Sequence, residues 1–255
     1  DVTVMLQHNH RFGRQPGIGA FAAALMRRQP AAARDSLAHG HDDLAHEPDP
    51  ARALGLLLER LLRQRDAAAL GDPEAALTAL SEARVLTAQR HGPSGALAWN
   101  RRVEQELAAR GHRVDHPYYV GRPVLVTEND HQSRIWNGDL GVAGRDEHGQ
   151  VVVWFRDARG QPRRLHPRRL PAHETAWATT VHKAQGSEFD DVLLVLPDRP
   201  GPLCNASLVY TGVTRARRRA VVCADEALLA AALTHWPTRR SGLADALSRR
   251  TRSSS

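Results

Sequence analysis

Two short apolar runs with a polar loop between them constrain the fold of this chain most. Residues 177–181 are rich in β-branched and aromatic side chains, and residues 192–196 form a continuous apolar run that Pro197 ends. Such runs are typical of strands that are covered on both faces, as in a parallel sheet. The polar loop between them is therefore predicted at a sheet edge, where open α/β folds place their ligands. A plain strand connection, with Gly186 present for backbone reasons, is the alternative.

The size and composition of the chain exclude several classes of protein. The chain has 255 residues, of which 42% are hydrophobic, enough to build a core. No apolar run approaches the ~20 residues that a membrane span needs, and no signal peptide is visible. Cys204 and Cys223 show neither a disulfide framework nor a metal spacing, which predicts a reducing cytoplasm. The chain starts with Asp1 in what reads as a strand already in progress, so we expect it to be part of a longer polypeptide.

The charge of the chain favours a polyanionic partner. The net charge is +7 and the sequence pI is about 10.5. Abundant Ala and Arg also follow from GC-rich coding, so the charge alone does not decide the matter. Lys183 is the single lysine among 35 basic residues, and it lies in the polar loop. A compact ammonium group retained there indicates a site that needs it, with chance survival at a surface position as the alternative.

Periodicity and caps predict the remaining elements of the α/β part. The spacing of leucines predicts an amphipathic helix over residues 52–65, and Asp72 followed by proline predicts the start of a second helix. Asn100 is expected to cap or begin a helix that ends near Gly111. Residues 31–50 are expected to be an exposed connection. Further strands are predicted over 84–88 and 219–224, and further helices over 208–216 and 226–233.

Residues 121–171 have a different character. Short β-rich runs recur through this region and are separated by turn sequences such as Asn137-Gly138-Asp139. This pattern predicts a small all-β unit, an incomplete barrel, inserted in an α/β chain. Trp136 and Trp154 are expected in its core, with base-stacking platforms as the alternative.

Three segments carry chemistry suited to a polyphosphate. They are residues 9–13, residues 180–190 and residues 208–217, and each brings an arginine or small polar groups to the edge of the predicted sheet. A guanidinium is always charged and forks onto phosphate oxygens. An arginine that reaches a γ-phosphate contributes roughly 10³–10⁵ in rate during nucleotide hydrolysis.

The same three segments resemble the later motifs of the superfamily 1 DNA helicases, and within that group the RecD branch. The sequences in question are Asn9-His-Arg-Phe-Gly13, Thr180-Val-His-Lys-Ala-Gln-Gly-Ser-Glu-Phe-Asp190 and Val209-Tyr-Thr-Gly-Val-Thr-Arg-Ala-Arg217. The resemblance implies a RecA-like second motor domain, with a parallel sheet and helices on both faces, interrupted by an SH3-like β-barrel. The implied division is residues 1–120 and 172–247 for the motor domain, 121–171 for the barrel and 248–255 for a disordered tail.

The roles of individual residues follow from this resemblance alone. Arg11 and Arg215 correspond to arginine fingers that reach the γ-phosphate. His10 takes a position that is often an adenine-stacking tyrosine, and an imidazole can also stack. The resemblance also implies nucleotide contacts by Gln185, Gly186 and Glu188, and contacts with single-stranded DNA by Thr180, His182 and Lys183.

The motifs that are missing from the chain shape the expected mechanism. The sequence contains no G-x-x-x-x-G-K-[S/T] phosphate loop. The resemblance therefore implies that ATP and Mg²⁺ are held mainly by an N-terminal half, and that this chain alone does not hydrolyse ATP at a helicase-like rate. The expected function is the C-terminal motor half of a 5′→3′ helicase in double-strand-break repair, with RecB-like and RecC-like partners in an exonuclease V complex. A stand-alone RecD-like or conjugative helicase, and a non-catalytic module that binds single-stranded DNA or a partner protein, remain as alternatives.

Overall fold

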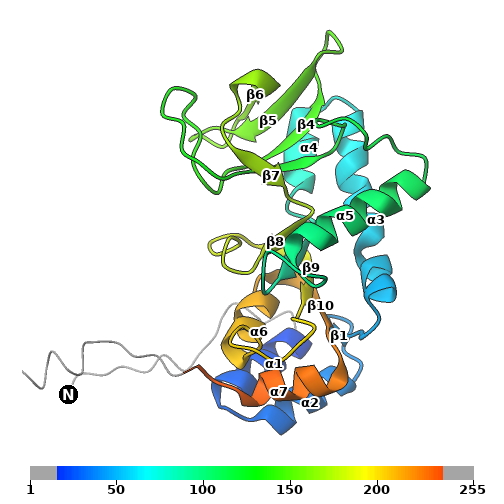
Figure 1. Cartoon of the computed structure of the whole chain (residues 1–255), viewed down its shortest axis with the longest axis vertical. Coiled ribbons are helices and arrows are strands. Elements are labelled where there is room, and N and C mark those ends of the chain that lie inside the picture. The colour runs from blue at the N-terminus through cyan, green and yellow to red at the C-terminus, as the bar shows by residue number, and fades with distance from the viewer. Residues whose placement is uncertain (1–15, 238–255) are drawn as a thin grey trace, which may run out of the picture.

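The computed structural model describes residues 16–237 and contains two five-stranded sheets. One sheet is parallel and the other antiparallel, and they lie toward opposite ends of the long axis of the molecule (Figure 1). No helix within residues 16–237 is long and apolar enough to cross a membrane.

The parallel sheet has the strand order β1-β10-β9-β2-β8, and all of its pairings are parallel. Every residue of β2 is buried, as is nearly all of β9, because helices cover both faces. This arrangement confirms the predicted α/β class. The strands are β1 (Leu44–His46), β2 (Ala83–Thr87), β8 (Ala178–Thr180), β9 (Phe189–Val195) and β10 (Ala216–Cys223).

Two sets of helices cover the two faces of this sheet. One apolar core joins α1, α2, α6 and α7 to one face, and a second core joins α3 and α5 to the other (Figure 1). Their bounds are α1 (Pro16–Met26), α2 (Pro30–Ala38), α3 (Pro50–Ala69), α5 (Ala96–Ala109), α6 (Ala206–Val213) and α7 (Glu226–Thr234).

Helix α3 forms where the leucine spacing predicts it. The Asp49 carboxylate accepts the backbone N–H groups of Ala51 at 2.7 Å and Arg52 at 3.1 Å, and Pro50 occupies the first turn. The leucine stripe of α3 then faces the sheet. Asp72 caps α4 (Pro73–Ala79) in the same way, as predicted.

The expectation of an exposed connection over residues 31–50 is wrong, because this segment contains α2 and the edge strand β1. Only a few apolar residues hold it in place, among them Leu37 and Leu44, which are buried. The carboxylate of Asp43 also accepts the backbone N–H groups of Gly17 at 3.1 Å and Ile18 at 2.9 Å. This contact fastens the start of α1, and a Cβ on Gly17 would lie 2.6 Å from the Asp43 carboxylate.

The antiparallel sheet confirms the predicted β unit. Its order is β6-β5-β4-β3-β7, and within residues 16–237 no ladder joins β6 to β7, so the sheet is open. It extends to β7, which lies beyond residue 171. The strands are β3 (Pro123–Val126), β4 (Leu140–Arg145), β5 (Val151–Arg156), β6 (Pro162–Leu165) and β7 (His173–Thr175), and a short 3-10 helix, η2 (Pro167–Arg169), precedes β7.

The two tryptophans of the β unit have different environments. Trp154 is buried and packs in a cluster with residues of α3 and α4, as expected for a core residue. The same expectation is wrong for Trp136, which is 44% exposed and meets the ring of His131 edge-on at 5.0 Å between centroids. Trp136 lies in the turn region before Asn137-Gly138, where the chain offers little to cover it.

The junction between the two sheets is short, since only Ala176 and Trp177 separate β7 from β8. Trp177 is fully buried, and its Nε1 donates to the Tyr119 hydroxyl at 2.6 Å, which in turn donates to Glu104 at 2.9 Å. Burial of this hydroxyl, with Glu104 beside it, raises the pKa of Tyr119. The junction is thus tied to α5 by a buried hydrogen-bond chain.

Asn100 does not begin a helix as expected. Gly95 is the N-cap of α5, and Asn100 lies inside that helix. Its side-chain amide donates to the carbonyl oxygens of Thr175 at 2.9 Å and Ala178 at 3.1 Å. The residue therefore holds the end of β7 and the start of β8, a role that only the tertiary fold reveals.

Candidate functional site

The polar loop of residues 181–188 crosses the parallel sheet from one edge to the other. Thr180, at the end of β8, pairs with Thr87 at the carboxyl end of β2. Phe189 begins β9, and the start of β9 lies beside the amino end of β2. Because the three strands are parallel, the loop must run from the carboxyl edge of the sheet to its amino edge. Its two ends therefore serve different surfaces.

Local hydrogen bonds and two buried residues fix the shape of this crossing loop. The backbone N–H of Ala184 donates to Thr180 at 3.1 Å, and that of Ser187 donates to Ala184 at 3.0 Å. Val181 and Ala184 are buried in the core under the loop. Gly186 has a φ of +86°, and a Cβ there would meet nothing within 4 Å, so the backbone angle and not crowding favours glycine.

Arg215 lies at the amino edge, beside the far end of the crossing loop. It follows α6 and precedes β10. Its Nη1 donates to the carbonyl oxygen of Ser187 at 3.4 Å, and its Nε donates to that of Thr211 at 3.3 Å. Its own carbonyl oxygen accepts the N–H of Phe189 at 2.9 Å. The predicted finger is thus held next to the Gly186–Glu188 part of the loop.

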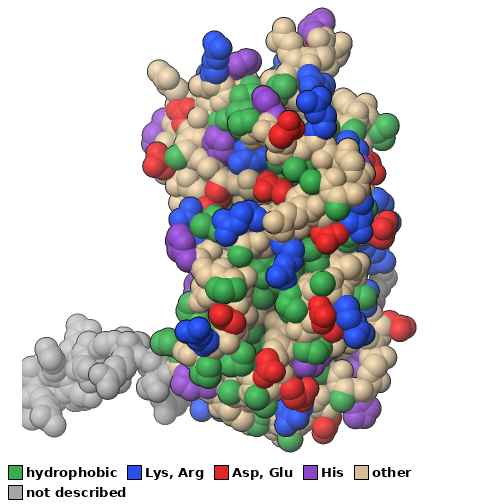
Figure 2. All heavy atoms as spheres, turned by 45° about the vertical axis from the view of Figure 1, so that its right-hand side comes forward, with side chains coloured by type: hydrophobic (Ala, Val, Ile, Leu, Met, Phe, Trp, Pro, Cys, Tyr) green, Lys and Arg blue, Asp and Glu red, His purple; other side chains and the backbone are tan. Residues whose placement is uncertain are grey.

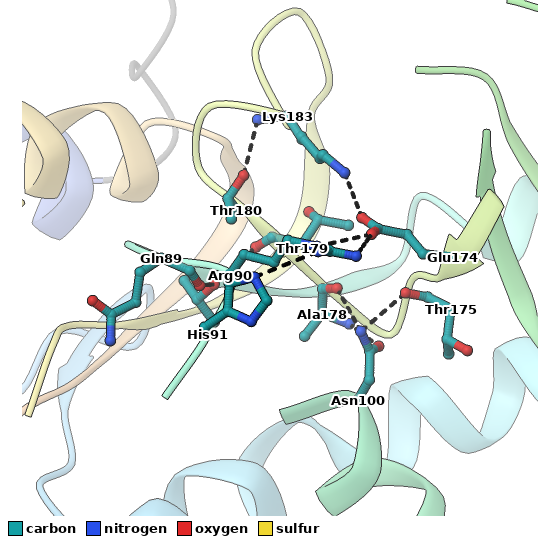
Figure 3. Close-up of polar contacts among 11 residues, drawn as sticks. Gln89, Arg90, His91, Asn100, Glu174, Thr175, Ala178, Thr179, Thr180 and Lys183 are labelled. Carbon is teal, nitrogen blue, oxygen red and sulfur yellow. Dashed lines mark hydrogen bonds and ion pairs between the residues drawn. The ribbon is translucent and has the colours of Figure 1, made fainter. Parts of the chain in front are cut away.

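Lys183 lies at the other end of the loop, in an ion cluster with two residues from other segments. Its Nζ lies 2.6 Å from Oε1 of Glu174, which belongs to β7. Arg90, which follows β2, donates to Oε2 of the same carboxylate from Nε at 3.3 Å and from Nη2 at 3.2 Å. In Figure 3 both cations reach Glu174 from different segments of the chain. Sequence reasoning missed Arg90 and Glu174; the position of Arg90 directly after a predicted strand was the one available signal.

The ion cluster lies in a groove of about 670 Å³ between the two sheets. Glu174 is the one acidic residue among those that line it. The lining residues are Arg90, Thr127, Leu170, Pro171, Ala172, His173, Glu174 and Lys183. On the face drawn in Figure 2, basic and acidic side chains alternate and do not form one continuous basic surface. Two strongly basic side chains, Arg90 and Lys183, and one carboxylate thus line this groove.

The three residues predicted to contact DNA do not all line this groove. Thr180 lies next to Lys183, since its Oγ1 accepts the Lys183 backbone N–H at 3.3 Å. His182 is exposed but lines a separate cavity of about 220 Å³ between the loop and α6. Gln185 lines that same cavity. The side chain of His182 thus shares a cavity with Gln185, a predicted nucleotide residue, and does not line the groove that Lys183 lines.

Two predicted site residues, His10 and Arg11, lie outside residues 16–237, and the structure does not describe them. Within the described part, no group of three or more His, Cys, Asp or Glu is placed to hold a metal ion. Cys204 and Cys223 are buried free thiols.

Comparisons with known proteins show which family the chain belongs to. Residues 175–223, which contain β8, the crossing loop, β9, α6 and β10, match the UvrD-like helicase C-terminal domain. The RecBCD enzyme subunit RecD of Mycobacterium tuberculosis H37Rv is 39% identical over 246 residues, which are 95% of this chain and 42% of that protein. The RecD subunit of Haemophilus influenzae is 36% identical over 173 residues, which are 67% of this chain and 26% of that protein.

Two further comparisons are with a RecD2 helicase and with the solved structure of a Pif1 helicase. The ATP-dependent RecD2 DNA helicase of Deinococcus radiodurans is 35% identical over 139 residues, 53% of this chain and 19% of that protein. A crystal structure of Pif1 helicase from Bacteroides, in complex with ADP-AlF3 and single-stranded DNA, gives a TM-score of 0.48 at 15% identity, over 98% of this chain and 57% of that one. That score is low, and the fold is defined here by its own strand order.

The parallel sheet, the loop that crosses it and the helix before Arg215 together define the C-terminal part of a UvrD-like, superfamily 1 helicase. Within that class, the sequence identifies the chain as the C-terminal portion of a RecD-type helicase. The chain spans about 42% of the length of the mycobacterial relatives that it matches.

Proposed function

We propose that this chain is the C-terminal motor half of an ATP-dependent 5′→3′ DNA helicase. In this role it supplies arginine fingers and single-stranded DNA contacts for unwinding in recombinational double-strand-break repair. Single-stranded DNA and RecB-like and RecC-like subunits are the proposed partners, and the cytoplasm is the proposed location. The names of the relatives, RecBCD enzyme subunits, support these partners.

The crossing loop is the observation that carries this proposal. One end of the loop lies beside Arg215, through the contact of its guanidinium with Ser187. The other end places Lys183 in the groove between the sheets. A motor must connect nucleotide turnover with a grip on its strand. A single segment that reaches both surfaces provides a physical link between them.

On the nucleotide side, the residues present fit a triphosphate that another domain holds. The guanidinium of Arg215 remains charged at every working pH and is oriented by two backbone carbonyls. It would face the γ-phosphate, with Arg11 as a second finger and His10 near the base. Gln185, Gly186 and Glu188 are exposed in the loop whose Ser187 contacts Arg215, and they would meet the phosphate and ribose. Bound ATP and Mg²⁺, held mainly by an N-terminal half, supply the phosphoryl group and the metal charge.

On the strand side, the chain offers cations and hydroxyl groups at the carboxyl edge of the sheet. Lys183 and Thr180 would contact the phosphate backbone, because cationic and hydroxyl side chains make most such contacts. His182 would contact DNA only where a strand also reaches the cavity that it shares with Gln185. Phosphate contacts carry no sequence information, which suits an enzyme that moves along any strand.

The proposal is tested in the natural full-length protein by Arg215→Ala, with Arg199→Ala in the exposed loop before α6 as the matched control. We expect Arg215→Ala to lower DNA-stimulated ATPase by at least about 10³-fold, the low end for an arginine finger, while fluorescence anisotropy shows retained binding of single-stranded DNA. Unchanged ATPase would remove Arg215 from this role. The 255-residue chain alone should show no helicase-like ATPase.

Two alternatives are decided by related measurements. Co-purification with RecB-like and RecC-like subunits distinguishes a complex subunit from a stand-alone helicase. The similarity to the RecD2 helicase supports the stand-alone alternative. A natural protein that binds single-stranded DNA but has no upstream phosphate loop would be a non-catalytic binding module.

A further inference from the structure

The ion cluster of Arg90, Glu174 and Lys183 joins the two sheets of the molecule. Arg90 and Lys183 follow two neighbouring strands of the parallel sheet, whereas Glu174 belongs to the antiparallel sheet. Each carboxylate oxygen has its own cation: Oε1 lies 2.6 Å from Lys183, and Oε2 accepts two N–H groups of Arg90 at 3.2 and 3.3 Å. The side chain of Glu174 is only 16% exposed, while those of Lys183 and Arg90 are 35% and 49% exposed.

A phosphodiester could bind between Arg90 and Lys183 in the same way as the carboxylate of Glu174 does. A phosphodiester has two unesterified oxygens that share one negative charge, as a carboxylate does. Arginine binds such a pair of oxygens with its fork, and lysine binds as a point charge. Both cations open onto the groove of about 670 Å³, and Glu174 is the one acid in its lining.

We propose that Glu174 occupies the place of a DNA backbone phosphate, and that Arg90 and Lys183 form one phosphate site of the strand path. An entering phosphodiester of single-stranded DNA displaces the carboxylate from both cations. Arg90 is thereby a further strand-binding residue, and Glu174 sets the affinity of the site by competing for it. This inference rests on the proposed function, since it assumes that the groove receives a single strand.

Displacement of Glu174 breaks the ionic part of the junction but leaves its hydrogen bonds in place. Thr175, the next residue, remains held through its carbonyl oxygen by Asn100 at 2.9 Å (Figure 3). Trp177 remains buried and bonded to Tyr119. The carboxylate can therefore move away from its cations without release of the strand that carries it.

The test measures binding of fluorescent oligo-dT to the full chain by anisotropy at several salt concentrations. Glu174→Gln should tighten binding by roughly twofold to thirtyfold, the range that two partly exposed ion pairs correspond to. It should also steepen the dependence of log K on log salt, because two released cations bind additional phosphate charge. Glu106→Gln is the matched control: it removes the same charge from an exposed ion pair with Arg110 that does not line the groove.

Two further variants show whether the change in binding comes from the ion cluster or from a folding defect. Glu174→Asp keeps the charge but withdraws it by one methylene, and it should give a smaller shift in the same direction. Arg90→Ala should weaken binding more in the Glu174→Gln background than in the wild type, because in that background Arg90 has no ion pair with residue 174 to give up before the DNA binds. Circular dichroism confirms the fold of each variant.

The outcomes separate this inference from the proposed function. If Glu174→Gln binds as the wild type does, or more weakly, while Lys183→Gln still weakens binding, the competitor role is wrong and the strand-binding role stands. If neither the wild type nor Glu174→Gln binds oligo-dT, both are wrong. Tighter binding by Glu174→Gln with no change for Glu106→Gln supports the inference, including the case in which the wild type does not bind measurably.

Discussion

The side chain of Asn100 makes two hydrogen bonds with the backbone of Ala178, one in each direction. Its Nδ2 donates to the Ala178 carbonyl oxygen at 3.1 Å, and its Oδ1 accepts the Ala178 N–H at 2.8 Å. Ala178 starts β8, the edge strand of the parallel sheet. An edge strand presents backbone groups that lack a neighbouring strand. Asn100 satisfies them as a further strand would, and Figure 3 shows it turned toward this edge.

Asn100→Ala should therefore destabilise the protein. The change leaves buried backbone groups of Ala178 without partners, which costs about 1–3 kcal/mol per group. We expect the free energy of unfolding to fall by about 2–6 kcal/mol in urea denaturation, since two groups lose their partner. Gln105→Ala, at an exposed position of the same helix, is the control and should change it by less than about 0.5 kcal/mol. Equal values for the two variants would contradict the edge-strand role.

Gly186→Ala should be destabilising through the backbone alone. Gly186 has a φ of +86° with open space around its Cβ position, so an alanine there is strained but not crowded. We expect a loss of about 1 kcal/mol in unfolding free energy. Gly201→Ala is the matched control, because Gly201 also has open space but no left-handed backbone. If the proposed nucleotide contact is right, the ATPase of the full-length protein falls as well.

Lys183→Gln should weaken binding of single-stranded DNA and reduce its salt dependence. Removal of one phosphate contact lowers the slope of log K against log salt by about 0.7 for a single strand. Titrations of oligo-dT from low to moderate salt measure this slope directly. Arg159→Gln, in an exposed turn of the antiparallel sheet, removes the same charge and should leave the slope unchanged. A change of the same size in both variants would indicate a general charge effect and not a contact.

Cys223 should make the protein less stable in alkali. Burial raises the pKa of the Cys223 thiol to about 11. The folded state therefore holds this proton while the unfolded state releases it, so the free energy of unfolding falls as the pH rises from about 9 to about 11. Cys223→Ala removes this contribution. Urea denaturation at pH 8 and at pH 10.5 gives the free energy of unfolding of the wild type and of Cys223→Ala. If the difference between the two proteins is the same at both pH values, the raised pKa of Cys223 is contradicted.

The sequence predicted the parts of the fold that depend on local pattern. Short β-branched and apolar runs predicted β2, β8 and β9, and the leucine spacing predicted α3. Helix α2 and strand β1 were missed because few apolar residues hold them, and their order depends on distant partners such as the contact of Asp43 with α1. Trp136 was misplaced because a tryptophan in a turn gives no sign of whether anything covers it.

In the candidate site, too, the sequence predicted the residues that stand out locally and missed those that only the fold brings together. Lys183 was singled out because it is the only lysine, and Arg215 because it lies in a recognisable motif. Arg90 and Glu174 were not, since the ion cluster joins three segments that are adjacent only after both sheets have formed. The separation of His182 from Lys183 was equally hidden, because neighbours in sequence reach different cavities once the loop crosses the sheet.

The path of residues 181–188 has a thermodynamic consequence. Coupling between a ligand at Ser187 and a ligand at Lys183 would run through this one short stretch, which Val181 and Ala184 anchor in the core. Linkage makes such coupling reciprocal. If a strand in the groove changes the affinity for a ligand near Arg215 by some factor, that ligand changes the affinity for the strand by the same factor.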